Sequence, residues 1–149
     1  MAALEKLRMD YAAFPYLITE LSLDFDLGTD VTTVISALRV QPANQSCQSG
    51  LPLVLDGCPE LQLGSLFIDG CPLPESEFEL TANTLTITRP PDRPFVLGCT
   101  VCIKPQDNTK LEGLYRTSGN FCSHCEAEGF RNITFFPDRS RCFISYTLL

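Results

Sequence analysis

Side chains that could bind a metal, act as a nucleophile or bind a cation lie close together in one segment, residues 111–131. Within it, residues 122–128 offer an imidazole, two thiols and two carboxylates, from Cys122, His124, Cys125, Glu126 and Glu128. Thiols and an imidazole can bind zinc or act as nucleophile and base, whereas a carboxylate can bind a cation. Three kinds of site are therefore considered: a metal site, a cysteine nucleophile and a cation-binding site.

A four-cysteine zinc site is the first possibility. Cys99 and Cys102 form one C-x-x-C pair, and Cys122 and Cys125 form a second at a spacing typical of zinc sites. However, the first pair falls within an alternating apolar stretch, residues 95–104, and residues three apart in a strand point to opposite faces. No glycine or proline between them makes a tight turn. We therefore favour buried strand thiols and keep the zinc site as the alternative.

A cysteine nucleophile with His124 as its base is the second possibility. Such a pair needs side chains within hydrogen-bond reach and a third group that orients the base. Cys125 is adjacent to His124 in the sequence, and neighbours in an extended segment point apart. The pattern therefore argues against this chemistry.

A carboxylate that binds a cation is the third possibility. From chemistry alone, the sequence Glu126-Ala127-Glu128 is most simply a solvated acidic loop. If the segment is extended, Glu126 and Glu128 share one face, and His124 lies on the same face. A carboxylate aimed from that face into a pocket would bind a cation.

Composition narrows the classes of function. The 149 residues suit one domain, and the net charge of −7 argues against nucleic acid as a partner. No apolar run is long enough to cross a membrane, and the N-terminus lacks the apolar core of a secretory signal. The eight cysteines are too few for a disulfide scaffold, so we expect reduced thiols and a cytoplasmic location.

Period-two patterning predicts short strands along most of the chain. Residues 20–27 alternate strictly and predict a half-buried strand, and a Gly-Thr-Asp turn leads into a second strand over residues 31–40. Leu21, Leu23, Phe25 and Leu27 form the apolar face of the first strand. Further strands are expected over residues 51–55, 61–68, 78–80, 85–88 and 95–104, and a short helix over residues 2–9. The series indicates an antiparallel all-β domain, a sandwich or a curved sheet.

Three stretches carry a resemblance to a known family. They are NTKLEGLY over residues 108–115, SGNFC over residues 118–122 and CEAEGFRNITF over residues 125–135. Together they resemble the N-terminal domain of zinc aminopeptidases of the aminopeptidase N type, to which alanyl and puromycin-sensitive aminopeptidases are related. The resemblance is specific over residues 108–139 and looser but collinear upstream. It implies a saddle-shaped antiparallel β-sandwich domain over residues 1–149, packed on a separate catalytic domain.

The resemblance also implies roles for two residues. In the family, a glutamate of the Cys-Glu-Ala-Glu-Gly stretch binds the free α-ammonium group of the peptide substrate, and Glu126 occupies that position. The residue two before it, usually glutamine, lines the pocket for the first side chain of the substrate. Here it is His124, and an imidazole differs in size from a carboxamide and can titrate near neutral pH. We therefore expect Glu126 and His124 to bind substrate, with no catalytic and no metal-binding residue.

The catalytic motifs of the family do not occur in these residues. The zinc motif H-E-x-x-H needs two histidines, and the sequence has one; the G-x-M-E-N motif does not occur either. We therefore expect zinc only in the full-length family, a missing catalytic domain as the partner, and no peptidase activity from this chain alone. Residues 1–139 are family-like and residues 140–149 diverge, which predicts a domain that is incomplete at its C-terminus. The alternative function is a non-enzymatic β-sandwich binding module with the four-cysteine zinc site.

Overall fold

The strands form three sheets in a computed structural model that describes residues 14–43, 50–139 and 145–146. The helix expected over residues 2–9 lies outside these ranges. One sheet has the order β11-β1-β2-β8-β4-β5, from Ser145–Tyr146, Tyr16–Leu27, Thr32–Pro42, Phe95–Ile103, Gln62–Ile68 and Cys71–Pro72. The second has the order β3-β7-β6, from Leu53–Asp56, Thr84–Ile87 and Phe78–Leu80. The third is the hairpin of β9 (Gly113–Thr117) and β10 (Asn120–His124).

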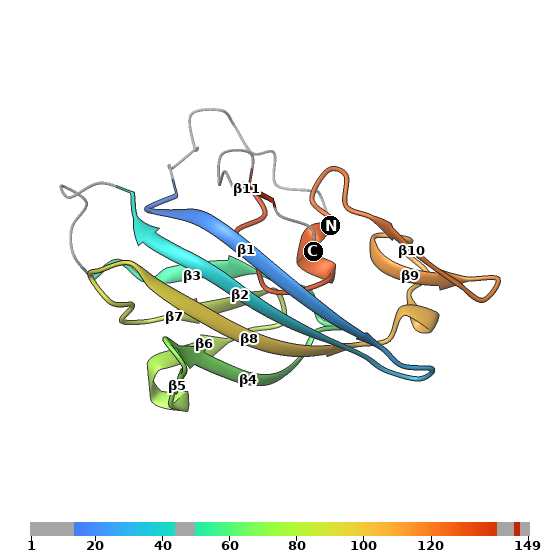
Figure 1. Cartoon of the computed structure of the whole chain (residues 1–149), viewed down its shortest axis with the longest axis horizontal. Helices are drawn as coiled ribbons and strands as arrows, with labels where there is room; N and C mark the ends of the chain where they lie inside the picture. Colours follow the sequence, from blue (N-terminus) through green and yellow to red (C-terminus); the bar gives the residue numbers. More distant parts are fainter. Residues whose placement is uncertain (1–13, 44–49, 140–144, 147–149) are drawn as a thin grey trace, which may run out of the picture.

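The two larger sheets lie face to face and enclose the core (Figure 1). The β9–β10 hairpin lies at the end of the molecule where β1 and β2 turn, and the Arg116 guanidinium donates to the Thr29 carbonyl of that turn at 3.4 Å. In the described part of the chain, strands are connected by short 3₁₀ helices: η2 (Glu75–Glu77), η3 (Pro105–Asp107) and η4 (Phe130–Asn132). The arrangement confirms the expected β-sandwich.

Strand β8 shows why the sequence pattern predicts this fold. Its residues alternate between buried and half-buried positions along the whole strand, with Leu97 and Val101 fully buried. It pairs antiparallel with both β2 and β4, so its inner face meets the apolar residues of the small sheet, including Leu55 and Ile87. Burying such side chains contributes about 1.5 to 3 kcal/mol each, so this face contributes substantially to the stability of the sandwich.

A β-bulge explains why the alternation of β1 is visible only from residue 20. The strand begins earlier, at Tyr16, and its pairing with β2 shifts between Ile18 and Glu20. Thr19 has no partner in the register, so the buried positions change from even to odd numbers there. A bulge moves the inward face by one residue, and a simple search for period two therefore misses the start of the strand.

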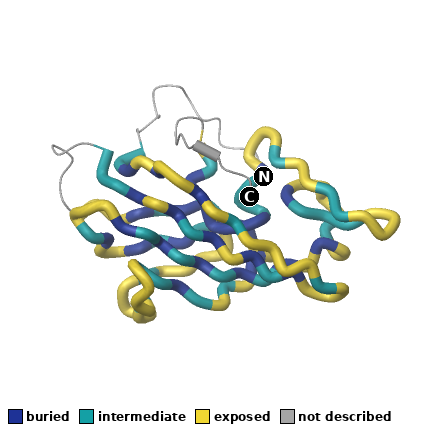
Figure 2. Tube along the Cα trace, viewed as in Figure 1, coloured by how far each residue is buried: buried dark blue, intermediate teal, exposed yellow. Residues whose placement is uncertain are grey.

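The outer half of β1 differs from the expected half-buried strand. Leu21 is buried, but Phe25 and Leu27, on the same face of the strand, are 37 % and 48 % exposed. Their partners on β2, Val34 and Thr32, are fully buried, so the exposure is confined to β1, the outer strand of the hairpin (Figures 1 and 2). The alternation therefore predicts the strand and its faces, but not how far each residue of the apolar face is buried.

The remaining strands follow the prediction, with one difference in direction. The strands expected over residues 51–55, 61–68, 78–80 and 85–88 correspond to β3, β4, β6 and β7, all antiparallel to their neighbours. The short β11 instead runs parallel to β1 and pairs with its edge at Glu20 and Leu21. Among the described residues, no helix has both the length and the apolar character that a membrane crossing needs.

Replacing Leu97 with alanine tests how much the buried face of β8 contributes to the free energy of unfolding. Leu97 is fully buried, so we expect Leu97→Ala to lower the free energy of unfolding by about 2 to 5 kcal/mol because the side chain is lost and a cavity remains. Leu80→Ala is the matched control, since Leu80 is 46 % exposed and should cost less than about 0.5 kcal/mol. Urea unfolding of both variants measures the difference, and equal losses would contradict this account of the core.

Candidate functional site

Residues 113–124, which include Cys122 and His124, form a tight hairpin of β9 and β10 that was not predicted from the sequence. Thr117 pairs with Asn120, so the loop between β9 and β10 is only Ser118 and Gly119. Both loop residues have positive φ angles, 50° and 84°, as a two-residue hairpin turn of type I′ requires. The Ser-Gly dipeptide between two short runs containing Leu114, Tyr115 and Phe121 was the signal for this hairpin.

The chain turns directly after His124, the last residue of β10. Residues 126–129 form a turn in which the Gly129 N–H donates to the Cys125 carbonyl at 3.0 Å, and the Glu126–Ala127 peptide bond is cis. The assumption of an extended segment is therefore wrong. The three side chains expected on one strand face are instead distributed between a strand end and a turn.

The two glutamates of the turn have different surroundings. Glu128 accepts a hydrogen bond from the Arg131 guanidinium at 2.9 Å. Glu126 is exposed, and its carboxylate makes no hydrogen bond or ion pair with any residue in the described part of the chain. Of the two carboxylates, Glu126 is the one available to a ligand.

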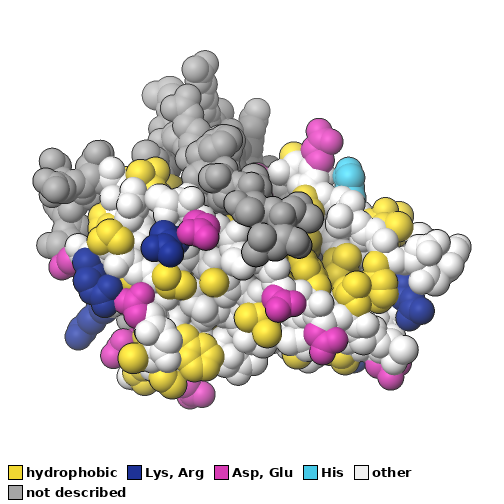
Figure 3. Space-filling model, viewed as in Figure 1, with side chains coloured by type: hydrophobic (Ala, Val, Ile, Leu, Met, Phe, Trp, Pro, Cys, Tyr) yellow, Lys and Arg dark blue, Asp and Glu magenta, His cyan; other side chains and the backbone are white. Residues whose placement is uncertain are grey.

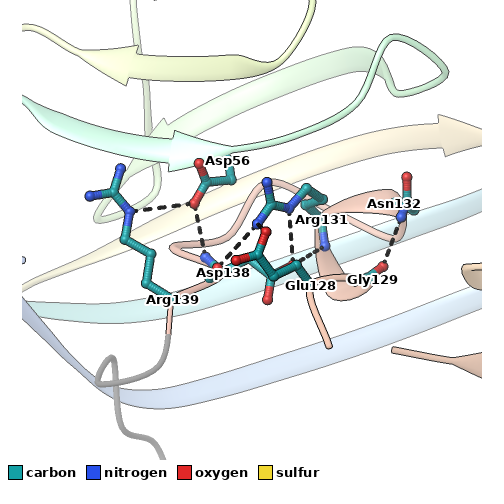
Figure 4. A network of polar contacts seen from close by, with 7 residues as sticks. All are labelled: Asp56, Glu128, Gly129, Arg131, Asn132, Asp138 and Arg139. Atoms are coloured by element: carbon teal, nitrogen blue, oxygen red, sulfur yellow. Dashed lines mark hydrogen bonds and ion pairs between the residues drawn. The ribbon is translucent and has the colours of Figure 1, made fainter. Parts of the chain in front are cut away.

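A polar network fastens the turn to the sandwich (Figure 4). The Asp138 carboxylate accepts hydrogen bonds from the backbone N–H and the Nε of Arg131, at 3.1 and 3.2 Å. The Asp138 N–H donates to the Asp56 carboxylate at 3.1 Å, and Asp56 exchanges two backbone hydrogen bonds with Phe136. Because Asp56 ends β3, the contacts run without a break from the small sheet to Glu128.

A close backbone approach fixes the other side of the turn. Gly113, at the start of β9, has a φ of 75°, and a Cβ there would lie 2.7 Å from the Cβ of Asn132. Asn132 donates its side-chain N–H to the Gly129 carbonyl at 3.2 Å. Only glycine permits both the backbone conformation and the contact at residue 113.

His124 lies beside the turn with its side chain exposed. As the last residue of β10 it pairs with Gly113, and the histidine side chain is visible at the surface in Figure 3. Hydrophobic side chains are also visible at the surface toward this end of the molecule. An imidazole two residues from a carboxylate without a partner gives this edge the polar groups that could contact a ligand.

The cysteines do not form the alternative zinc site. Cys99 faces the core and is 2 % exposed, whereas Cys102 lies on the opposite face of β8, 3.9 Å from the Thr33 hydroxyl. Across the described residues, no three His, Cys, Asp or Glu side chains come close enough to hold one metal ion. The donor groups in the described part of the chain therefore do not fit zinc.

A separate pocket of about 250 Å³ is lined in part by Asn132, which also donates a hydrogen bond to Gly129 of the turn. Its walls include Val31, Ile103 and Leu114, and Lys110 at its rim pairs with Glu60 at 2.7 Å. Neither Glu126 nor His124 lines it. The sequence analysis did not predict this pocket, because its walls come from segments far apart in the chain.

Comparison with known proteins finds relatives of one kind, although no protein-family model matches the chain. Aminopeptidase N of Caulobacter vibrioides is 44 % identical over 93 % of this chain, and that of Escherichia coli is 39 % identical over 95 %. Among solved structures, aminopeptidase A of Legionella pneumophila superposes over 90 % of this chain with a TM-score of 0.80 and 34 % identity. The chain spans 16 % of the length of each of these three relatives.

A more distant structure supports the fold alone. The M1 zinc metallopeptidase of Deinococcus radiodurans superposes over 83 % of this chain and 29 % of its own, with a TM-score of 0.64 and 18 % identity. The similarity of backbone therefore persists where the identity of the residues is largely lost.

Two glycines offer a matched test of the packing behind the turn. Gly113 and Gly119 both have positive φ angles, but a Cβ at Gly119 meets nothing within 4 Å. Gly119→Ala should therefore cost about 1 to 2 kcal/mol from backbone conformation alone. Gly113→Ala should cost about 1 to 3 kcal/mol more, because Asn132 must move. Thermal or urea unfolding measures both, and equal costs would contradict the close approach.

The reactivity of the thiols tests the burial of Cys99. Burial raises the pKa of the Cys99 thiol from 9.0 to about 12, so the folded protein keeps this thiol protonated where the unfolded chain loses the proton. Its contribution to stability is therefore complete below pH 9 and declines as the pH rises from 9 towards 12. At pH 8 we expect iodoacetamide to modify the exposed Cys71 and to spare Cys99 until the protein is unfolded. Peptide mass spectrometry reads each site, and early modification of Cys99 would contradict the prediction.

Proposed function

We propose that this chain, which is homologous to the N-terminal β-sandwich domain of M1 zinc aminopeptidases, binds the free amino terminus of peptide substrates in a complete enzyme through Glu126. The observation that carries the proposal is the contrast between the two glutamates of the turn. Glu128 is held by Arg131, whereas Glu126 is exposed and has no partner among the described residues. A carboxylate kept free on an anchored turn suits a cationic ligand.

The chemistry of an aminopeptidase supports this choice of ligand. Such an enzyme must distinguish a peptide end, which carries an α-ammonium group, from the neutral amide groups within a chain. A carboxylate makes a charge-assisted hydrogen bond to an ammonium group, about twice as strong as one between neutral groups. The Legionella pneumophila aminopeptidase A was solved in complex with aspartic acid, an amino acid that carries such an ammonium group.

We further propose that His124 helps to line the pocket for the first side chain of the substrate. Its imidazole is exposed at the end of β10, and the turn that carries Glu126 begins with the next residue. A group near the bound ammonium would contact the side chain on the same substrate carbon. The cytoplasmic location expected from the sequence stays a prediction.

The zinc chemistry of the family is assigned to other parts of a complete enzyme. The chain has one histidine, and its described residues hold no set of donors for a metal ion. In this proposal the domain therefore binds and orients the amino terminus of the peptide, and the catalytic domain of the enzyme supplies the metal.

The Glu126→Gln variant tests the proposed function. The full chain is joined to the remainder of the Caulobacter vibrioides aminopeptidase N in place of the matching segment, and hydrolysis of aminoacyl p-nitroanilides is measured. We expect Glu126→Gln to lower kcat/KM by a factor equivalent to about 2 to 5 kcal/mol, because the charged contact to the ammonium group is lost. The thermal midpoint should not change, since Glu126 has no partner to lose among the described residues.

The control is Glu79→Gln, which removes a carboxylate from an exposed position of β6. This variant should keep the kcat/KM of the parent hybrid. If Glu126→Gln also keeps it, Glu126 does not bind the amino terminus and the proposed function is wrong.

A further inference from the structure

We infer that Arg131 and Glu128 are positioning residues for Glu126, because their ion pair holds the turn that carries this carboxylate at one place on the sandwich. The inference rests on the proposed function of Glu126. The observation that supports the inference is an unbroken series of contacts that begins at β3 and ends at Glu128, two residues from Glu126. The series runs through Asp56, Asp138 and Arg131.

The remaining contacts of the turn lie at its two ends. Residues 126–128 are all exposed, so no apolar packing of their side chains restrains them. At these ends, the Gly129 N–H donates to the Cys125 carbonyl, and the Gly129 carbonyl accepts a hydrogen bond from a side chain outside the turn. The ion pair between Arg131 and Glu128 is therefore the side-chain contact that reaches the outer part of the turn.

The guanidinium of Arg131 is itself well held. Its side chain is 26 % exposed and that of Asp138 is 12 % exposed, whereas typical surface ion pairs are open to water. Arg131 donates from Nε to the Asp138 carboxylate and from a terminal nitrogen to both the Asp138 carbonyl and Glu128. A planar guanidinium with several fixed donors orients its partners, which a lysine cannot do as well.

The position of a binding carboxylate matters as much as its charge. A displacement of about 1 Å in a substrate-positioning group can cost on the order of 100-fold in rate. If the Arg131–Glu128 pair is lost, Glu126 keeps its charge, but its carboxylate is no longer held in one place. The expected consequence is weaker binding of the amino terminus.

The test uses Glu128→Gln and Arg131→Lys in the same hybrid enzyme that contains the full chain. We expect each variant to raise the KM for aminoacyl p-nitroanilides roughly 10-fold or more, within the range that misplacement causes. A loss of folded enzyme alone would instead lower the apparent kcat and leave KM unchanged. Glu20→Gln and Arg39→Lys are the matched controls, because Arg39 and Glu20 form an exposed pair on the β1–β2 sheet.

A double-mutant cycle shows whether the effect passes through Glu126. In the Glu126→Gln background, Glu128→Gln should raise KM no further, because the carboxylate that it positions has been removed. Thermal unfolding of each variant accompanies the kinetics. Glu128→Gln is the decisive variant, since its side chain is 60 % exposed and its replacement spares the buried contacts of Arg131.

The outcomes separate the two proposals. A rise in KM for Glu128→Gln that disappears in the Glu126→Gln background, with unchanged controls, supports the positioning role. If Glu126→Gln impairs the enzyme but Glu128→Gln leaves KM unchanged, or raises it equally in both backgrounds, the positioning role is overturned and the proposed function stands. If Glu126→Gln itself has no effect, both are overturned.

Discussion

The partly buried carboxylate of Asp138 is the contact on which the candidate site depends. It accepts hydrogen bonds from the backbone and the guanidinium of Arg131, while its own N–H donates to Asp56 at the end of β3. A charge in this position is costly unless it is paired, and here charge-assisted hydrogen bonds meet that need. The same contacts connect η4 and Asp138 to the small sheet. They therefore hold the exposed turn in place on the sandwich.

The sandwich was predictable because its strands obey one simple period. The alternation of β8 specifies which of its faces is buried, and the same holds for β2. Where the period is broken, the prediction fails for a local reason. The bulge at Thr19 hides the start of β1, and the tight turn at Ser118 and Gly119 hides a hairpin with short, mixed strands.

The site was harder to predict because its geometry depends on contacts between distant segments. Glu126 was identified from its resemblance to a family, whereas periodicity placed Glu126 and Glu128 on one extended face, which is wrong. What distinguishes the two glutamates is Arg131, which in turn is held by Asp138 and Asp56. No local pattern in the sequence shows that Asp56, 82 residues before Asp138, takes part in this arrangement.

The excess of carboxylates near the turn favours a cation, although no single contact there would bind one strongly. Glu126, Glu128 and Asp138 bring three carboxylates to this region, and Arg131 pairs with the last two of them. The pKa of the nearby Cys125 thiol is raised, chiefly by burial and further by the charge of Asp138, so this thiol stays neutral. Because Arg131 is committed to two of the carboxylates, the excess negative charge lies at Glu126. An exposed carboxylate binds a cation weakly in water, so its full effect requires a second surface that excludes water from the contact.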